Sequence, residues 1–127
     1  MKKPKLPSLK SLKIKLDKVF SEYIRARDKG KPCVTCGSRK WPLQCGHWIK
    51  RGHTAVRWDE RNAAGQCARC NLYLNGAQDE FAAVIVKRHG DFGLNDLLRL
   101  KHTTVKMSRE DFEERIKHFT DKLAKDE

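Results

Sequence analysis

Two Cys-x-x-Cys pairs constrain the fold of this chain more than any other feature of its sequence. The cysteines of the two pairs, which 30 residues separate, are Cys33, Cys36, Cys67 and Cys70. Tetrahedral zinc is held by four thiolates that arrive as two such short chelates. Gly37 permits the tight turn of a zinc knuckle directly after the first pair. The spacing therefore predicts a structural zinc site in a treble-clef arrangement.

Two other roles for the paired cysteines, burial without a metal and redox chemistry, agree less well with the sequence. Four buried cysteines without a metal are an alternative, but chance rarely places two such pairs in 127 residues. A redox-active pair would follow a strand of a βαβ unit, and neither pair does. The fifth cysteine, Cys45, is expected to be a small apolar core residue rather than a ligand.

The charge balance indicates a polyanionic partner. The chain has 28 Lys and Arg residues against 16 Asp and Glu residues, a net charge of +12. Such a chain attracts nucleic acid through phosphate contacts and counterion release. No apolar run approaches the ~20 residues of a membrane span, and the first residues lack the ~7–15-residue apolar segment of a secretory signal. We therefore expect no membrane association and a cytoplasmic location, where cysteines bind metal rather than form disulfides.

The first residues differ from the rest of the chain. Residues 1–11 mix lysines with Pro4 and Pro7, so we expect a flexible basic arm that cannot begin a helix. Residues 12–127 are expected to form a single zinc-bound domain. The core of that domain is expected over residues 33–76. Supporting helices are expected before it, over residues 12–30, and after it, over residues 77–127.

Apolar periodicity and capping signals predict the flanking helices. The apolar face of the first helix is formed by Leu12, Leu16, Val19, Phe20, Tyr23 and Ile24. The later predicted elements are a helix of about two turns after Cys70, a helix over Ala77–Arg88 closed by Gly90, a turn at 91–93, a short helix over Leu94–Leu100 and a last helix opened by a capping box at Ser108–Asp111. The predicted fold class is α+β.

Polar residues between and beside the zinc pairs follow a particular order. His47 lies in the run Gln44-Cys45-Gly46-His47-Trp48-Ile49, Asn62 follows, and Asn71 comes directly after the last cysteine. This order resembles that of the ββα-metal (HNH-type) nucleases, in the variant with Asn in the third position. In those proteins a catalytic hairpin is held inside a zinc-binding frame.

Longer runs carry a closer resemblance. The runs FSEYIRARDKGKPCVTCG and CGHWIKRGHTAVRWDERNAAGQCARCNLYLNG are similar to the phage NinG/Rap recombination endonucleases. The resemblance implies a treble-clef/ββα-metal nuclease core that cleaves branched DNA such as Holliday junctions and D-loops. It also implies a phage or prophage product in a bacterial host.

The chemistry assigns roles to three of these residues. Hydrolysing a phosphodiester needs a water that is deprotonated and aimed in line, and an imidazole with a pKa near neutrality suits that step, so His47 is the expected general base. The resemblance implies that Asn62 hydrogen-bonds the hairpin and holds the loop that orients His47. It also implies that Asn71 offers its carbonyl oxygen to Mg²⁺ or Mn²⁺.

Position 46 departs from the commonest nuclease pattern. Many such enzymes carry Asp or His directly before the base as a second metal ligand, but this chain has Gly46 there. The candidate replacements are His53, Asp59 and Asn75. Asn75 shares a helix face with Asn71, and Asp59 supplies the anionic oxygen that Mg²⁺ prefers. Asp59 could equally form an ion pair with a neighbouring arginine, and His53 could instead help to position the scissile phosphate.

Basic and aromatic residues surround the zinc frame. The expected phosphate contacts are Lys50, Arg51, Arg57, Arg61 and Arg69. Stacking on unpaired bases at a branch is a candidate role for Trp41, Trp48 and Trp58. For at least two of the three tryptophans we favour packing in the core.

Other functions remain open at this point. The first alternative is a non-catalytic zinc-stabilised DNA-binding module, and the second is a structural zinc protein that docks a partner. Cutting both strands of a junction favours a two-fold homodimer, for which the amphipathic terminal helices offer apolar surface.

Overall fold

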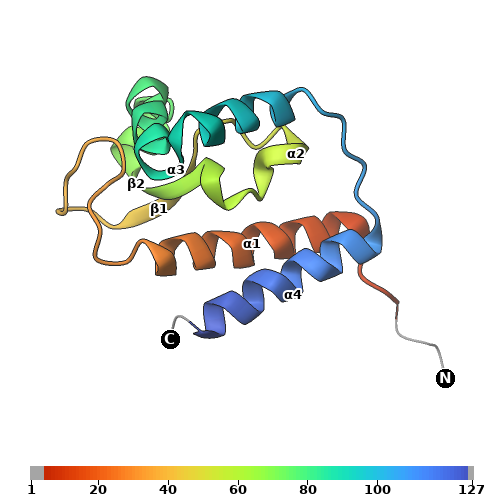
Figure 1. The fold of residues 1–127 in the computed structure, drawn as a ribbon. Coiled ribbons are helices and arrows are strands. Elements are labelled where there is room, and N and C mark those ends of the chain that lie inside the picture. The colour runs from red at the N-terminus through yellow and green to blue at the C-terminus, as the bar shows by residue number, and fades with distance from the viewer. Residues whose placement is uncertain (1–4, 126–127) are drawn as a thin grey trace.

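The protein, described here from a computed structural model that covers residues 5–125, consists of helices on both sides of a two-stranded sheet (Figure 1). Helices α1 (Leu9–Arg27) and α4 (Arg109–Lys125) lie side by side and run in the same direction. The sheet lies above them in Figure 1, and α3 (Gln78–Lys101) lies on the side away from α1. This combination of helices with a small antiparallel sheet confirms the α+β class.

Helix α1 begins earlier than the sequence suggested. The hydroxyl of Ser8 accepts a hydrogen bond from the backbone N–H of Ser11 at 3.0 Å, which caps the first turn. Pro7 precedes this cap and therefore does not interrupt the helix. The arm predicted over 1–11 is wrong for its last three residues, which are helical, and residues 1–4 lie outside the described part of the chain.

The two cysteine pairs lie in and around a small sheet and its connections. The elements of this region are β1 (Leu43–His47), α2 (Thr54–Arg57), a 3₁₀ turn η1 (Glu60–Asn62), β2 (Ala63–Cys67) and a π-helical turn η2 (Arg69–Tyr73). The strands pair antiparallel, with Leu43 opposite Cys67 and His47 opposite Ala63. The two-turn helix predicted after Cys70 is instead the single turn η2, which begins one residue before it.

Helix α3 bends at one glycine. Gly90 has φ 71° and ψ 175°, a conformation that only glycine adopts readily, and it separates two helical halves. The predicted end of a helix at Gly90 is therefore confirmed. The turn predicted at 91–93 is wrong, because the second half of the helix resumes directly after the break. The capping box at Ser108 and Asp111 is present, with reciprocal bonds of 2.8 and 3.1 Å.

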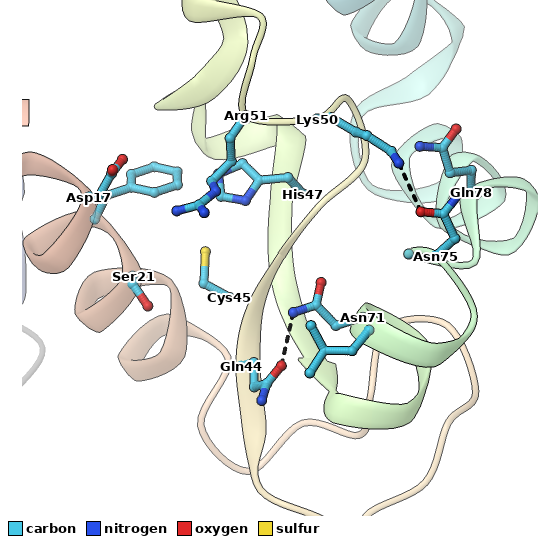
Figure 2. A pocket seen from close by; sticks show the side chains of 13 residues that line it. Asp17, Ser21, Gln44, Cys45, His47, Lys50, Arg51, Asn71, Asn75 and Gln78 are labelled. Carbon is cyan, nitrogen blue, oxygen red and sulfur yellow. Dashed lines mark hydrogen bonds between the residues drawn. The ribbon is translucent and has the colours of Figure 1, made fainter. Parts of the chain in front are cut away.

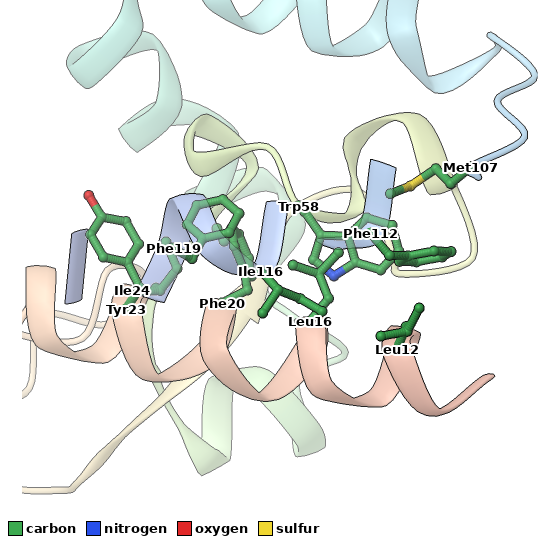
Figure 3. Packing of buried hydrophobic residues seen from close by; sticks show 11 residues of the cluster. Leu12, Leu16, Phe20, Tyr23, Ile24, Trp58, Met107, Phe112, Ile116 and Phe119 are labelled. Atoms are coloured by element: carbon green, nitrogen blue, oxygen red, sulfur yellow. The ribbon is translucent and has the colours of Figure 1, made fainter. Parts of the chain in front are cut away.

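The main core lies between α1 and α4 (Figure 3). All but one of the predicted apolar positions of α1 are buried there, and Val19 is half-buried beside them. From the rest of the chain the core takes Trp58, Ala63, Met107, Phe112, Ile116 and Phe119. The two terminal helices thus cover each other's apolar faces, so these faces cannot supply the dimer interface that the sequence suggested.

A second core cluster joins α3 to the loop after β1. Its buried members are Ile49, Val56, Ala64, Phe81, Ile85 and Leu97. Within residues 5–125, no helix combines the length and the hydrophobicity that crossing a bilayer would require.

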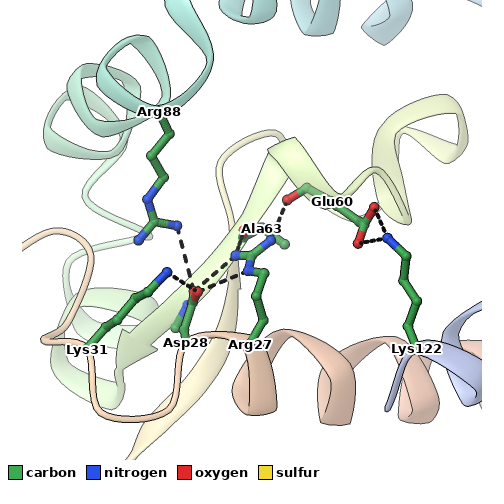
Figure 4. Close-up of polar contacts among 8 residues, drawn as sticks. Arg27, Asp28, Lys31, Glu60, Ala63, Arg88 and Lys122 are labelled. Atoms are coloured by element: carbon green, nitrogen blue, oxygen red, sulfur yellow. Dashed lines mark hydrogen bonds and ion pairs between the residues drawn. The ribbon is translucent and has the colours of Figure 1, made fainter. Parts of the chain in front are cut away.

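A buried carboxylate ties α1, β2 and α3 together (Figure 4). Asp28 is 1% exposed and accepts hydrogen bonds from the guanidinium of Arg27 at 2.9 Å and from the backbone N–H of Gly65 at 2.8 Å. Arg88 of α3 lies 3.7 Å from the same carboxylate. Burial raises the pKa of Asp28, but the bonds from Arg27 and Gly65 outweigh burial, and the net pKa is lowered.

Candidate metal centre and active site

The four predicted zinc ligands come together. The Sγ atoms of Cys33, Cys36, Cys67 and Cys70 all lie within 4.8 Å of one another. With Zn–S bonds of about 2.3 Å, a tetrahedral site has an S···S edge of about 3.8 Å. Cys36 Sγ and Cys67 Sγ are 3.8 Å apart. The cluster can therefore hold a structural zinc ion without rearrangement of the backbone.

The loop of the first pair is shaped for thiolates. Gly37 takes φ 75° and donates its N–H to the carbonyl of Cys33 at 2.9 Å, which closes the knuckle. The backbone N–H of Cys67 points at Cys33 Sγ, 3.3 Å away. Burial raises the pKa of Cys33, but backbone N–H groups of Cys36 and Cys67 outweigh it and bring the pKa down to about 6. Zinc binds the thiolate, so this loop favours the binding form.

A cavity of about 490 Å³ lies beside the hairpin (Figure 2). Helix α1 forms one wall, β1 lies in the middle, and η2 with the start of α3 forms the opposite wall. The predicted site residues that line it are His47, Lys50, Arg51, Asn71 and Asn75. Cys45 also lines it while packing against the main core, and burial raises its pKa to about 12.

His47 stands at the end of β1 in a defined orientation. Its Nε2 lies 2.9 Å from the backbone oxygen of Arg57. A carbonyl oxygen only accepts, so Nε2 carries the proton and Nδ1 keeps its lone pair. Burial lowers the pKa of His47 to about 4, and the nearby cations Arg51 and Arg57 lower it in the same direction. The imidazole is therefore neutral at pH 7 and able to accept a proton.

Amide groups form the opposite wall of the cavity. Asn71 Nδ2 donates to Gln44 Oε1 at 2.9 Å, which leaves Asn71 Oδ1 without a hydrogen-bond partner among residues 5–125. Asn75 Oδ1 accepts from the ammonium of Lys50 at 2.8 Å. Asn71 thus keeps an amide oxygen that is unengaged by the described residues, whereas that of Asn75 is engaged by Lys50.

Gly46 is glycine for a steric reason. A Cβ at this position would lie 2.2 Å from Oε1 and 2.8 Å from Cβ of Gln66. Gln66 is fully buried and fixed by hydrogen bonds from its Nε2 to the Thr35 hydroxyl and the Gly76 carbonyl, at 3.0 and 2.8 Å. No Asp or His can therefore occupy position 46 without displacing this glutamine.

Asn62 is buried outside the cavity and holds the loop after β1. Its Oδ1 accepts from the N–H of Ile49 at 2.9 Å, and its Nδ2 donates to the carbonyls of Ile49 and Val56 at 3.0 and 3.2 Å. Its own carbonyl accepts from the N–H of Trp48. These bonds fix the chain just after His47, which is the placement implied by the resemblance.

Two of the candidate metal ligands lie elsewhere. Asp59 caps η1 and forms an ion pair with Arg61 at 2.8 Å, so its carboxylate is engaged outside the His47 cavity. His53 is the residue that precedes α2, and it does not line the cavity either. Of the three replacements for a ligand at position 46, the fold brings only Asn75 to the cavity.

The predicted DNA contacts also divide into two groups. Lys50, Arg51 and Arg69 are exposed. Arg57 is paired with Asp17 at 2.6 Å, and Arg61 is paired with both Asp59 and Asp96. Intramolecular ion pairs compete with phosphate binding, so Lys50, Arg51 and Arg69 are the better placed to contact DNA.

Asp17 on α1 is a site residue that sequence reasoning missed. It lines the cavity and accepts two hydrogen bonds from Arg57 and one, at 2.9 Å, from Trp58 Nε1. Burial raises the pKa of Asp17, but these bonds outweigh it and lower the net pKa. The signal in the sequence was an acid next to the apolar stripe of a lysine-rich helix, directly after Leu16.

Together these observations define a class: a small α+β domain in which a four-cysteine cluster able to hold zinc lies beside a polar, histidine-containing cavity. The chain belongs to the NinG family, because the family model described as "Bacteriophage Lambda NinG protein" matches residues 1–127.

Curated relatives agree with the family. Protein ninG of Salmonella phage P22 is 30% identical over 79 residues, which cover 59% of this chain and 38% of the relative. Protein ninG of Escherichia phage lambda is 29% identical over 79 residues, with the same coverage. The chain thus matches well under half the length of these relatives. No solved structure matches.

Proposed function

We propose that this chain is a metal-dependent endonuclease that hydrolyses phosphodiesters in branched DNA, such as Holliday junctions and D-loops. The cavity that combines His47, Asn71 and Asn75 next to the cysteine cluster supports this proposal most strongly. In this proposal β1, β2 and η2 correspond to the ββα-metal core, and the cysteines form its treble clef.

His47 acts as the general base. Its Nδ1 lone pair takes a proton from a water while the water oxygen forms a bond to phosphorus and the bond to the leaving sugar oxygen breaks. The pKa of about 4 in the free protein is low for this task. An anionic phosphate in the cavity would raise it towards neutrality, because the imidazolium is then stabilised by a nearby negative charge.

The cavity fits a divalent ion with amide ligands. Asn71 and Asn75 would hold Mg²⁺ or Mn²⁺ through their Oδ1 atoms, with water completing the coordination, since both ions prefer hard oxygen donors. When bound, the ion supplies positive charge to the phosphorane and to the leaving oxygen. Lys50 and Arg51 on the rim neutralise neighbouring phosphates.

One observation favours a second candidate, a non-catalytic zinc-stabilised DNA-binding module. Among the described residues that line the cavity, Asp17 is the one carboxylate, and Arg57 already occupies it. The cavity therefore offers a divalent ion no free anionic ligand, which would weaken its binding.

Cleavage assays with a matched variant distinguish the two. The zinc-loaded protein is incubated with a labelled four-way junction, a D-loop and a linear duplex of the same sequence, with and without Mg²⁺ or Mn²⁺. We expect metal-dependent cuts in the branched substrates and little cutting of the duplex. His47→Ala should abolish cutting and keep its junction affinity. Binding without cleavage by the wild type in every metal would support the binding module and overturn the nuclease.

A further inference from the structure

A second concave surface lies further along α1 and β1, beyond the cavity of His47. Its volume is about 450 Å³, which is in the range of sites for small ligands. Its lining residues are Arg25, Lys29, Gly30, Lys31, Arg39, Trp41, Pro42 and Leu43. We call it the Trp41 pocket. None of these residues is acidic, and four of them are cationic.

Exposure singles out Trp41 among the three tryptophans. Trp58 is 3% exposed and belongs to the main core, and Trp48 is half-buried against the second cluster. Trp41 is 56% exposed. Packing therefore accounts for two of the indoles and leaves the third unexplained. A large aromatic ring at the surface is typical of a binding site, because its stacking energy is available to a ligand.

Cations surround this indole. The ammonium of Lys40 lies over the Trp41 ring, 5.2 Å from its centre, and the residue as a whole is more than half exposed. Lys29 is exposed and has no ion-pair or side-chain hydrogen-bond partner within residues 5–125. Arg39 is fixed in the pocket by a hydrogen bond to the carbonyl of Gly30 at 2.6 Å. The pocket thus combines an aromatic face with free positive charge.

The Trp41 pocket and the cavity of His47 share two elements, α1 and β1. On α1, Ser21 lines the cavity and Arg25, one turn later, lines the pocket. On β1, Gln44 lines the cavity and Leu43 lines the pocket. From Asp17 to Arg25 the helix rises about 12 Å, the length of a few nucleotides of a DNA strand. A strand that follows α1 from the cavity of His47 would therefore reach Arg25 in the Trp41 pocket.

We propose that the Trp41 pocket binds an unpaired nucleotide of a DNA strand, with its base stacked on Trp41 and its phosphates against Arg25 and Lys29. Stacking between neighbouring base pairs hides both faces of a base inside a duplex, so this pocket selects DNA that is single-stranded at a branch. The inference rests on DNA as the partner in the proposed function, and it does not require cleavage.

Anisotropy titrations test the pocket. The zinc-loaded protein is titrated with a labelled duplex carrying a single-stranded flap and with the blunt duplex alone. Stacking on one base contributes about 1–3 kcal/mol, so Trp41→Ala should weaken flap binding by about 5- to 160-fold. It should leave blunt-duplex binding unchanged. Trp41→Phe should retain most of the affinity, and Phe92→Ala, which removes an aromatic ring that is 80% exposed on α3, should have no effect.

Other outcomes overturn the proposal. Equal loss of flap and duplex binding in Trp41→Ala would mean that the ring supports the loop rather than a base, and no loss in either would mean that it contacts no DNA. Displacement of the flap by polyglutamate as effectively as by single-stranded DNA of equal charge would indicate an acidic protein as the partner. His47→Ala should bind like the wild type, so a failure of cleavage alone leaves the pocket intact.

Discussion

Arg57 connects Asp17 to His47. The Asp17 carboxylate accepts two hydrogen bonds from the side chain of Arg57, and the backbone carbonyl of Arg57 accepts one from His47 Nε2. These contacts link Asp17 through Arg57 to the orientation of the imidazole, and in the proposed nuclease Asp17 would be a positioning residue.

This arrangement predicts the effect of Asp17→Asn. Loss of the charge releases Arg57, and a small misplacement of a catalytic group can cost up to about 100-fold in rate. We expect the rate of single-turnover cleavage to fall by about tenfold or more, while the affinity for the junction stays unchanged. Glu22 on the same helix forms none of these bonds, so the Glu22→Gln variant should cut normally. An equal loss of affinity in Asp17→Asn would contradict the positioning role.

A second prediction for a single residue concerns the contribution of Asp28 to folding stability. Its folded pKa is lowered, so its contribution to stability is complete above the unfolded pKa of about 3.9 and is lost as pH falls through the lower folded value. At pH 7, Asp28→Asn should destabilise the fold by about 1–3 kcal/mol in urea unfolding, because it removes the buried charged acceptor of the bonds from Arg27 and Gly65. Asp121→Asn, which removes an exposed pair with Lys117, should change stability by less than about 1 kcal/mol. A similarly small loss of stability in both variants would contradict the stabilising role of the hydrogen bonds and ion pairs of Asp28.

The site residues that the sequence predicted are those that a short, local sequence pattern identifies. The cysteine spacing predicted the cluster, and the resemblance implied a hairpin around His47. Asp17 could not be foreseen because its partner Arg57 is 40 residues away. The same holds for Gly46, whose reason is the side chain of Gln66 on the neighbouring strand.

Side-chain patterns predicted the apolar face of α1 and the start of α4, but not the start of α1, where Ser8 caps the helix directly after Pro7. The apolar face of α1 and the box at Ser108 and Asp111 follow from periodicity and capping chemistry. The break at Gly90 depends on the backbone of a single residue, so the sequence indicated the break but not that the helix resumes at once.

The bend of α3 gives a prediction at the scale of elements. Gly90→Ala places a Cβ in open space, but its backbone conformation is nearly exclusive to glycine. We expect a loss of about 1–3 kcal/mol in unfolding free energy from backbone strain alone. Gly52→Ala, at an exposed position without positive φ, serves as the control and should change stability by about 0.5 kcal/mol or less. An unaltered stability of Gly90→Ala would mean that α3 can straighten.

At the scale of the whole molecule, the cysteine cluster joins the loop before β1 to the end of β2 and to η2. Cys36 is exposed, so without a metal its replacement would be almost neutral. With zinc bound, Cys36→Ala should lower the zinc content below one ion per chain and lower the unfolding midpoint, since metal binding contributes to folding. Elemental analysis and thermal unfolding measure both. Cys45→Ala should keep its zinc, and equal zinc content in both variants would contradict the assigned ligands.

The proposed nuclease depends on one arrangement, in which a hairpin held by zinc places a neutral imidazole opposite amide oxygens that can bind a second ion. Anomalous diffraction from crystals grown with Mn²⁺ and a branched DNA measures this most directly. We predict a zinc peak among the four cysteines, a manganese peak at Asn71 and Asn75, and a phosphate between that ion and Nδ1 of His47. Manganese bound elsewhere, or an imidazole with no DNA phosphate within reach, would contradict the proposed nuclease.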